Sequence, residues 1–201
     1  MNSRTFNAPP DLPAFFIEDV HKMQADLWQH AQRALGPCTH GYTIAPARFV
    51  AEEASCAMRI GNEISIYLDL NAAADWACCA AILGHELVHA LDGPSGSPSW
   101  LEEGMGRLFG MGQCAAMFGD APTHLCRGAY FHALKSVADI PDALGVVRSL
   151  RSKGLRMRSL TPAQLMAEVP TLDDRAAHML CARFTPGVIG VARVQDYSHS
   201  T

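Results

Sequence analysis

Residues 71–91 are the segment that most restricts the fold of this chain. The segment is rich in alanine, contains no proline, and begins with Asn71, a residue typical of helix N-caps. Asp92-Gly93-Pro94 follows directly and is a strong stop signal, because glycine commonly ends helices and proline cannot continue them. The sequence therefore predicts one long, well-defined helix that ends near residue 91.

The last turns of this helix carry the pattern H-E-x-x-H at residues 85–89. Four residues turn a helix by about 400°, so His85 and His89 project from nearly the same face and can reach one metal ion. Glu86 lies beside them and can contact a bound water without being a ligand. A catalytic zinc ion takes three protein ligands and leaves a position for water, whose pKa falls toward about 7. The pattern predicts a zinc site with Glu86 as proton acceptor; the alternative is two surface histidines on an amphipathic helix.

A third ligand is expected from the segment W-L-E-E-G, which begins the next helix after a short loop rich in glycine, proline and serine. Glu102 has a structural role available, because it can form a capping box with Ser99 at the start of this helix. Glu103 has no such role, and it is close to Gly104 and Gly106, which permit close contact between helices. We therefore favour Glu103 over Glu102 as the ligand.

The rest of the chain predicts an α+β fold with a small antiparallel sheet. Alternating apolar residues at 56–60 and 64–68 flank Gly61-Asn62, which is typical of a hairpin with a two-residue turn. Apolar residues at three- and four-residue spacing predict a helix over 12–35. The other expected elements are a weak strand over 42–50, interrupted by Pro46, helices over 123–138, 142–152 and 173–184, and helix caps at Thr161 and Thr171.

A chain of 201 residues fits one domain. We expect residues 1–201 to form a single domain with four consecutive parts. They are an N-terminal helix with the small sheet (1–70), the two helices that carry the site (71–118), a helical half (119–184) and an irregular tail (185–201).

Composition and charge exclude several classes of partner. Apolar residues make up 49% of the chain and charged residues only 18%, so it can bury a sizeable core. A net charge of −4 offers no general attraction to nucleic acid or to an anionic membrane.

The N-terminus lacks the basic-then-apolar pattern of a secretory signal, so a cytoplasmic location is expected. The seven cysteines are odd in number and include an adjacent pair, which favours reduced thiols buried as small apolar residues.

The segments H-E-L-V-H and W-L-E-E-G together resemble the gluzincin zinc metallopeptidases, in which H-E-x-x-H is followed by a glutamate ligand, often within W-L-x-E-G. The resemblance implies that His85, His89 and Glu103 hold one zinc ion and that Glu86 acts as general base and general acid. It also implies a zincin-like order of a small sheet, an active-site helix, a glutamate helix and a helical half. Strand 63–69 would then be the edge strand that pairs with an extended substrate.

The gluzincins also use a tyrosine or histidine of the helical half to stabilise the oxyanion of the tetrahedral intermediate. We expect Tyr130 in this role. The alternatives are three histidines of the same half, His124, His132 and His178. Arg107 lies one turn after Glu103, so it could orient that ligand or bind a carboxylate of the substrate; the alternative is a plain surface ion pair.

Five basic residues with no acidic residue between them are Arg148, Arg151, Lys153, Arg156 and Arg158. A solvated face is the default interpretation of this run, and a site for an acidic peptide or partner is the alternative.

The expected function is that of a zinc metallopeptidase, whose partner is a peptide or peptide-like substrate. Two other classes remain open. One is a catalytically silent, metal-binding regulator or partner-binding module, and the other is a tailoring enzyme that hydrolyses an amide of a small metabolite.

Overall fold

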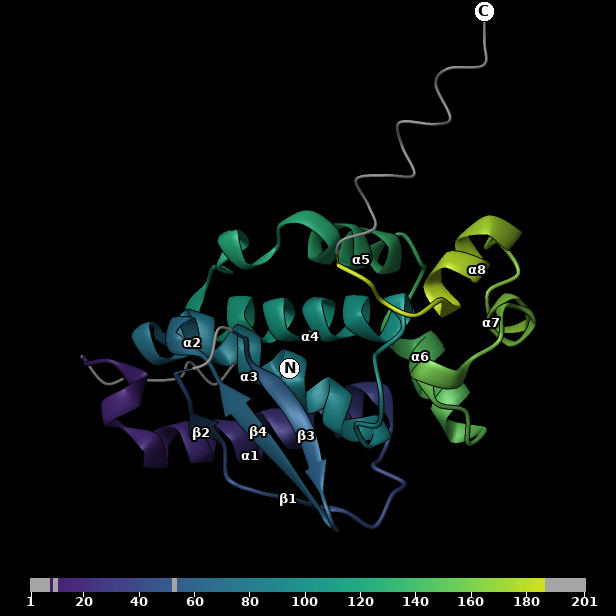
Figure 1. Ribbon diagram of the computed structural model, residues 1–201. Coiled ribbons are helices and arrows are strands. Elements are labelled where there is room, and N and C mark those ends of the chain that lie inside the picture. The colour runs from purple at the N-terminus through teal and green to yellow at the C-terminus, as the bar shows by residue number, and fades with distance from the viewer. Residues whose placement is uncertain (1–7, 9–10, 52–53, 187–201) are drawn as a thin grey trace, which may run out of the picture.

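The computed structural model describes residue 8 and residues 11–51 and 54–186, and it has an α+β fold, as predicted (Figure 1). In chain order its elements are η1 (Pro13–Phe15), α1 (Ile17–Leu35), β1 (Thr43–Ile44), β2 (Arg48–Phe49), β3 (Cys56–Ile60), β4 (Glu63–Leu68), α2 (Leu70–Ala74), α3 (Trp76–Asp92), α4 (Trp100–Phe118), η2 (Thr123–Leu125), α5 (Gly128–Ala138), α6 (Ala143–Ser152), η3 (Met157–Ser159), α7 (Pro162–Glu168) and α8 (Asp174–Cys181).

Helix α3 lies at the centre of the molecule. Every residue of α3 except Ala77 is buried, as expected for a helix that is apolar on nearly all sides. Strands β3 and β4 and helix α1 contact α3, and α4 packs along it (Figure 1). Helix α5 contacts α4, so α4 lies between α3 and α5. Two hydrophobic clusters meet at α3, one toward the sheet and one toward the C-terminal helices.

The helix predicted over 71–91 is two helices, and Asn71 is not its cap. The carboxylate of Asp69 accepts hydrogen bonds from two backbone N–H groups and caps α2. The chain is extended at Asp75, whose Oδ1 accepts a hydrogen bond from the N–H of Cys78 at 2.7 Å and begins α3. The break follows from the short carboxylate of Asp75, which replaces the missing backbone acceptors at the start of a new helix.

The sheet is mixed rather than purely antiparallel. Strands β3 and β4 form the predicted hairpin around Gly61-Asn62. Strands β1 and β2 both pair in parallel with β4, and Pro46 lies between them, where the sequence predicts an interruption. β4 is therefore the central strand. The prediction that strand 63–69 is the edge is wrong, because β3 occupies one side of β4 and β1 and β2 occupy the other.

The C-terminal helices follow the predicted ranges with three changes, the first of which is that the helix predicted over 173–184 ends at Cys181. The helix expected over 123–138 begins with the short turn η2, and α5 proper starts at Gly128. Thr161 forms a complete capping box with Gln164, as predicted, but Asp173 rather than Thr171 caps α8. The tail predicted over 185–201 lies outside the described residues except for its first two.

No helix in the described part of the chain has both the length and the apolar character needed to cross a bilayer. All seven cysteines lie in this part, and none of them forms a disulfide. Cys78, Cys79 and Cys114 are buried, in agreement with the predicted role as small apolar residues.

Candidate metal centre

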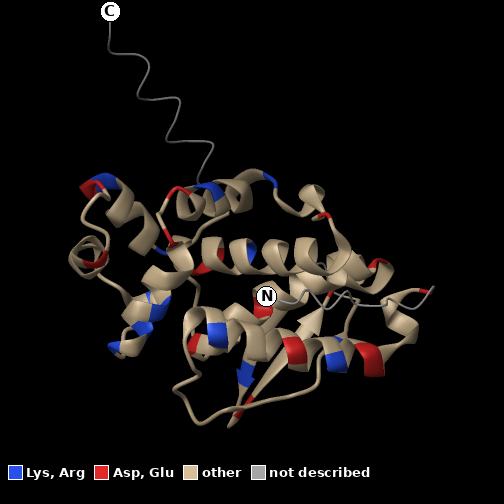
Figure 2. Ribbon diagram, turned by 180° about the vertical axis from the view of Figure 1, so that it is seen from behind, with Lys and Arg blue, Asp and Glu red and all other residues tan. Residues whose placement is uncertain are grey.

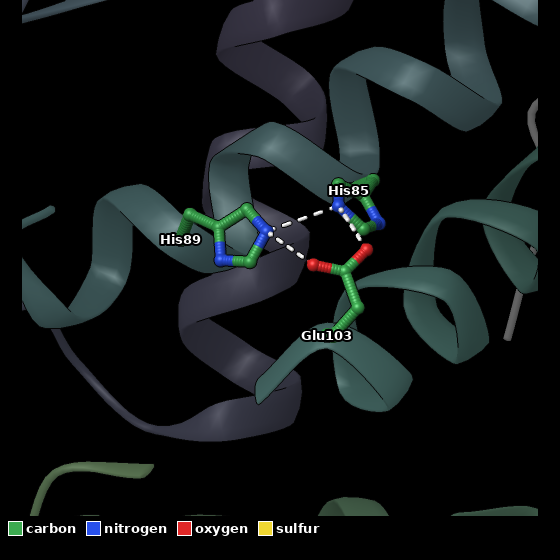
Figure 3. Close-up of side chains that lie close together, drawn as sticks. All are labelled: His85, His89 and Glu103. Atoms are coloured by element: carbon green, nitrogen blue, oxygen red, sulfur yellow. Dashed lines mark hydrogen bonds and ion pairs between the residues drawn. The ribbon is translucent and has the colours of Figure 1, made fainter. Parts of the chain in front are cut away.

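Helices α3 and α4 bring His85, His89 and Glu103 together (Figure 3). The two imidazoles project from successive turns of α3, and the carboxylate of Glu103 reaches them from the first turn of α4. The Nε2 atoms of the histidines are 3.0 Å apart, and the oxygens of Glu103 lie 3.2 Å from Nε2 of His85 and 3.5 Å from Nε2 of His89. All three residues are buried, so the alternative of two surface histidines is wrong.

These separations match what one small divalent ion requires. Ligand atoms about 2.0–2.1 Å from a tetrahedral zinc ion are about 3.3 Å from one another. The observed separations of 3.0, 3.2 and 3.5 Å lie on either side of that value. In addition, the buried Oε1 of Glu103 has no hydrogen-bond donor among the described residues. The cluster could therefore hold a metal ion, and its two imidazoles and one carboxylate suit zinc.

Glycines of α4 allow this close approach of the two helices. A Cβ atom on Gly106 would lie 2.8 Å from Nδ1 of the His85 imidazole, and one on Gly110 would lie 2.2 Å from the carbonyl oxygen of Ala81. Gly104 has the same function toward α5, where a Cβ would lie 2.4 Å from the carbonyl oxygen of Ala133. The predicted close helix contact at the glycines is confirmed, and it positions the imidazole of His85 against α4.

Glu102 does not complete the predicted capping box. Its N–H donates to Oγ of Ser99 at 3.1 Å, but its carboxylate turns away from Ser99 and accepts a hydrogen bond from Nδ1 of His89 at 2.8 Å. The same oxygen accepts a hydrogen bond from Arg158. When Nε2 binds a metal ion, this arrangement keeps the remaining proton of His89 on Nδ1. Arg158 was missed from sequence because no local pattern links it to a residue 56 positions earlier.

Electrostatic interactions favour an anionic Glu103. Burial raises the pKa of Glu103, but its interactions with His85 and His89 outweigh burial, so the pKa lies well below its usual range. Burial lowers the pKa of His85. Burial also acts to lower the pKa of His89, but the hydrogen bonds to Glu102 and Glu103 dominate and raise it to about 10. A cation bound at Nε2 of His89 must therefore displace a proton from this imidazole.

A cavity of about 310 Å³ opens beside the three residues. Glu86 lines it, and Oε1 of Glu86 is 3.9 Å from Nε2 of His85. Cys56 and Ala57 at the start of β3 also line the cavity, so the edge strand at this site is β3 and not residues 63–69. Residues of the loop between α3 and α4 also line the cavity.

The predicted oxyanion donor Tyr130 lies in this cavity. The three alternatives do not line it. His124 is close to the thiol of Cys78, His132 lies beside Phe131, and His178 contacts Asp174 within α8. The structure therefore places Tyr130, and none of the three histidines, near the candidate ligands.

Arg107 also lines the cavity, with its guanidinium 4.4 Å from the centre of the Tyr130 ring. Its Nε atom is 3.8 Å from Oε1 of Glu103, and its side chain is only 16% exposed. The alternative of a plain surface ion pair is therefore wrong.

The basic run from 148 to 158 is not a single solvated face, although basic residues gather along α6 and the segment after it (Figure 2). Arg151 is buried and donates to the carboxylate of Asp92, and Arg158 is bound to Glu102. Of the remaining three residues, Arg148 donates to a backbone carbonyl of α1, Lys153 pairs with Glu168, and Arg156 is exposed. These buried pairs anchor the C-terminal helices to α3 and α4.

Comparisons of the chain with protein-family models, with curated proteins and with solved structures each found no match. The resemblance to the gluzincins therefore rests on the residues of α3 and α4, and the zincin-like order of elements stays a prediction.

Proposed function

We propose that this protein is a zinc-dependent hydrolase that cleaves a peptide or peptide-like amide bond. The observation that carries the proposal is the convergence of His85, His89 and Glu103 in the lining of a cavity that Glu86 also lines. Three nitrogen and oxygen ligands with a further carboxylate beside them are typical of hydrolytic zinc sites, in which one coordination position stays open to water. Zinc held by these residues would lower the pKa of a bound water toward about 7 and polarise the carbonyl group of the amide.

Glu86 is the proposed general base and general acid. Its carboxylate is buried within the cavity and is close to the imidazole of His85, but the three proposed ligands do not include it. It can accept a proton from the attacking water and later deliver that proton to the departing amine nitrogen. Such proton transfers typically contribute about 10²- to 10⁴-fold to the rate.

Tyr130 is the proposed donor to the oxyanion. Burial, together with the negative charge of Glu103, raises the pKa of its phenol, so the hydroxyl stays protonated near neutral pH and can donate a hydrogen bond. Removing one such donor typically costs about 10²- to 10³-fold in turnover.

A first test of the proposed function combines a chelator with a change at Glu86. The zinc-loaded protein is incubated with a diverse peptide library, and cleavage should disappear when a chelator removes the metal. Glu86→Gln should keep its zinc and lower turnover by at least about 10²-fold. Glu63→Gln, a change at an exposed glutamate of β4, is the control and should leave turnover unchanged. Unchanged hydrolysis by Glu86→Gln would remove this residue from the mechanism.

The size of the cavity favours a second candidate, hydrolysis of an amide in a small metabolite. A volume of about 310 Å³ is at the lower end of the range for small-molecule sites, so a substrate larger than a short peptide would extend beyond it. A zinc-loaded protein that leaves every library peptide intact but hydrolyses small acyl amides would support this candidate. Bound zinc without hydrolysis of either class would instead support a silent metal-binding module.

A further inference from the structure

Arg107 is a charged side chain of the cavity whose polar groups the proposed mechanism does not use. Its Nε atom is buried and has no hydrogen-bond partner among the described residues. One face of the guanidinium lies over the Tyr130 ring, and the nearest carboxylate oxygen, Oε1 of Glu103, is 3.8 Å from Nε. Since arginine keeps its charge at any pH relevant to proteins, this site holds a permanent, poorly compensated cation.

The charge balance of the cavity makes this cation available to a ligand. The other arginine in the lining, Arg158, is already paired with Glu102. The carboxylates in the lining are Glu86 and Glu103, and a divalent ion bound by Glu103 would offset both of them. Arg107 then remains as a net positive charge in a largely buried position, where an unpaired charge is costly. A second carboxylate, supplied by a bound molecule, would remove that cost.

We infer that Arg107 binds a carboxylate of the substrate and so determines specificity. This inference rests on the proposed function and names its substrate class as an amide that carries a carboxylate close to the bond that is cleaved. The planar guanidinium favours a carboxylate because it can donate two parallel hydrogen bonds to the two oxygens.

The position of Arg107 fixes how close this carboxylate must be. The Nε atom of Arg107 is 3.8 Å from Oε1 of Glu103, which belongs to one of the candidate ligands. Consecutive residues of a peptide advance by about 3.8 Å, so the carboxylate belongs to a residue that adjoins the scissile bond. It is either the C-terminal carboxylate of the residue after that bond or an aspartate or glutamate side chain at the same place.

Binding of three hydroxamates to the zinc-loaded protein tests this inference without requiring turnover. Each probe is a malonyl hydroxamate, which anchors on zinc, joined to alanine, to alaninamide or to aspartic acid α-amide. The first carries a terminal carboxylate, the second carries none and the third carries a side-chain carboxylate. We expect at least one carboxylate probe to bind about tenfold or more tightly than the alaninamide probe in calorimetric titrations, and the tighter of the two identifies the source.

Variants of Arg107 separate substrate binding from a purely structural role. Arg107→Met should abolish the difference between the probes, and Arg107→Lys should keep part of it, while zinc content is measured for both. Arg59→Met is the matched control, because Arg59 also lies over a tyrosine ring, that of Tyr42 at 5.1 Å, but does not line the cavity. Arg59→Met should preserve the full difference.

Equal binding of the three probes by the wild-type protein would overturn the inference, and so would a preference that survives in Arg107→Met. Failure of the proposed function looks different. In that case the carboxylate probes are still preferred, but no amide is hydrolysed.

Discussion

Replacing Gly106 with alanine tests whether the glycines of α4 exist to hold the candidate site together. A Cβ at this position would lie 2.8, 3.0 and 3.2 Å from three atoms of the His85 imidazole. Ordinary contacts of a Cβ atom begin at 3.4 Å, so the ring must shift by about 0.6 Å. The helices cannot simply move apart to relieve the contact without losing the close packing at Gly110.

The expected effect on stability is small and the effect on metal binding is large. Overpacking costs about 1–3 kcal/mol, while exchanging glycine for alanine within a helix returns up to about 1 kcal/mol, so the net loss is about 0–2 kcal/mol. Metal–ligand distances tolerate only about 0.2 Å, less than the required shift of His85. We therefore expect the zinc affinity of Gly106→Ala to fall by at least about tenfold, since even changes behind the ligands cost that much.

The control is Gly112→Ala on the same helix, where an added Cβ would have no neighbour within 4 Å. It should stabilise the protein by up to about 1 kcal/mol and leave zinc affinity unchanged. Urea unfolding of the metal-free proteins gives the stabilities, and competition with a chromophoric chelator gives the affinities. If Gly106→Ala is as stable as Gly112→Ala and binds zinc equally well, the reasoning about the contact between Gly106 and His85 is refuted.

Three further predictions concern residues around this site and the core. Glu102→Gln removes the charge that holds His89 and Arg158, and zinc affinity should fall about 10- to 100-fold in chelator competition; an unchanged affinity would show that Glu102 does not position His89. Arg151→Met leaves the carboxylate of Asp92 buried without its arginine partner, so the free energy of unfolding measured in urea should fall by about 3–5 kcal/mol. Breaking any single exposed ion pair should lower it by less than about 1 kcal/mol. Burial raises the pKa of the Cys78 thiol to about 12, so the thiol stays protonated at pH 8. Cys78 should therefore react with iodoacetamide far more slowly in the folded than in the urea-unfolded protein, and equal rates would contradict this pKa.

Local patterns predicted the elements that carry the site. The hairpin turn at Gly61-Asn62, the interruption at Pro46 and the capping box of Thr161 all depend on residues close together in sequence, and the structure has each of them. The two histidines follow from helical spacing alone, and the choice of Glu103 over Glu102 follows from the start of α4. The structure brings the two histidines and Glu103 together in one cluster.

The wrong predictions depend on competition between local signals or on contacts between distant segments. Asp75 lies within the segment 71–91 that predicts one helix, and only its side-chain hydrogen bond to the Cys78 N–H shows that the helix restarts there. The capping box predicted for Glu102 failed because its carboxylate binds two distant partners instead, the imidazole of His89 and the guanidinium of Arg158. Which strand forms the edge of the sheet depends on the parallel pairing of β1 and β2, for which the sequence contains no signal.

Zinc content per chain tests the proposed centre most directly. The protein is stripped with a chelator, reloaded with excess zinc, dialysed and measured by elemental analysis, together with Glu103→Ala and Glu102→Ala. We expect one zinc ion per wild-type chain, nearly complete loss in Glu103→Ala, and retention of a substantial fraction in Glu102→Ala. Equal zinc content in all three proteins would contradict a site built from His85, His89 and Glu103.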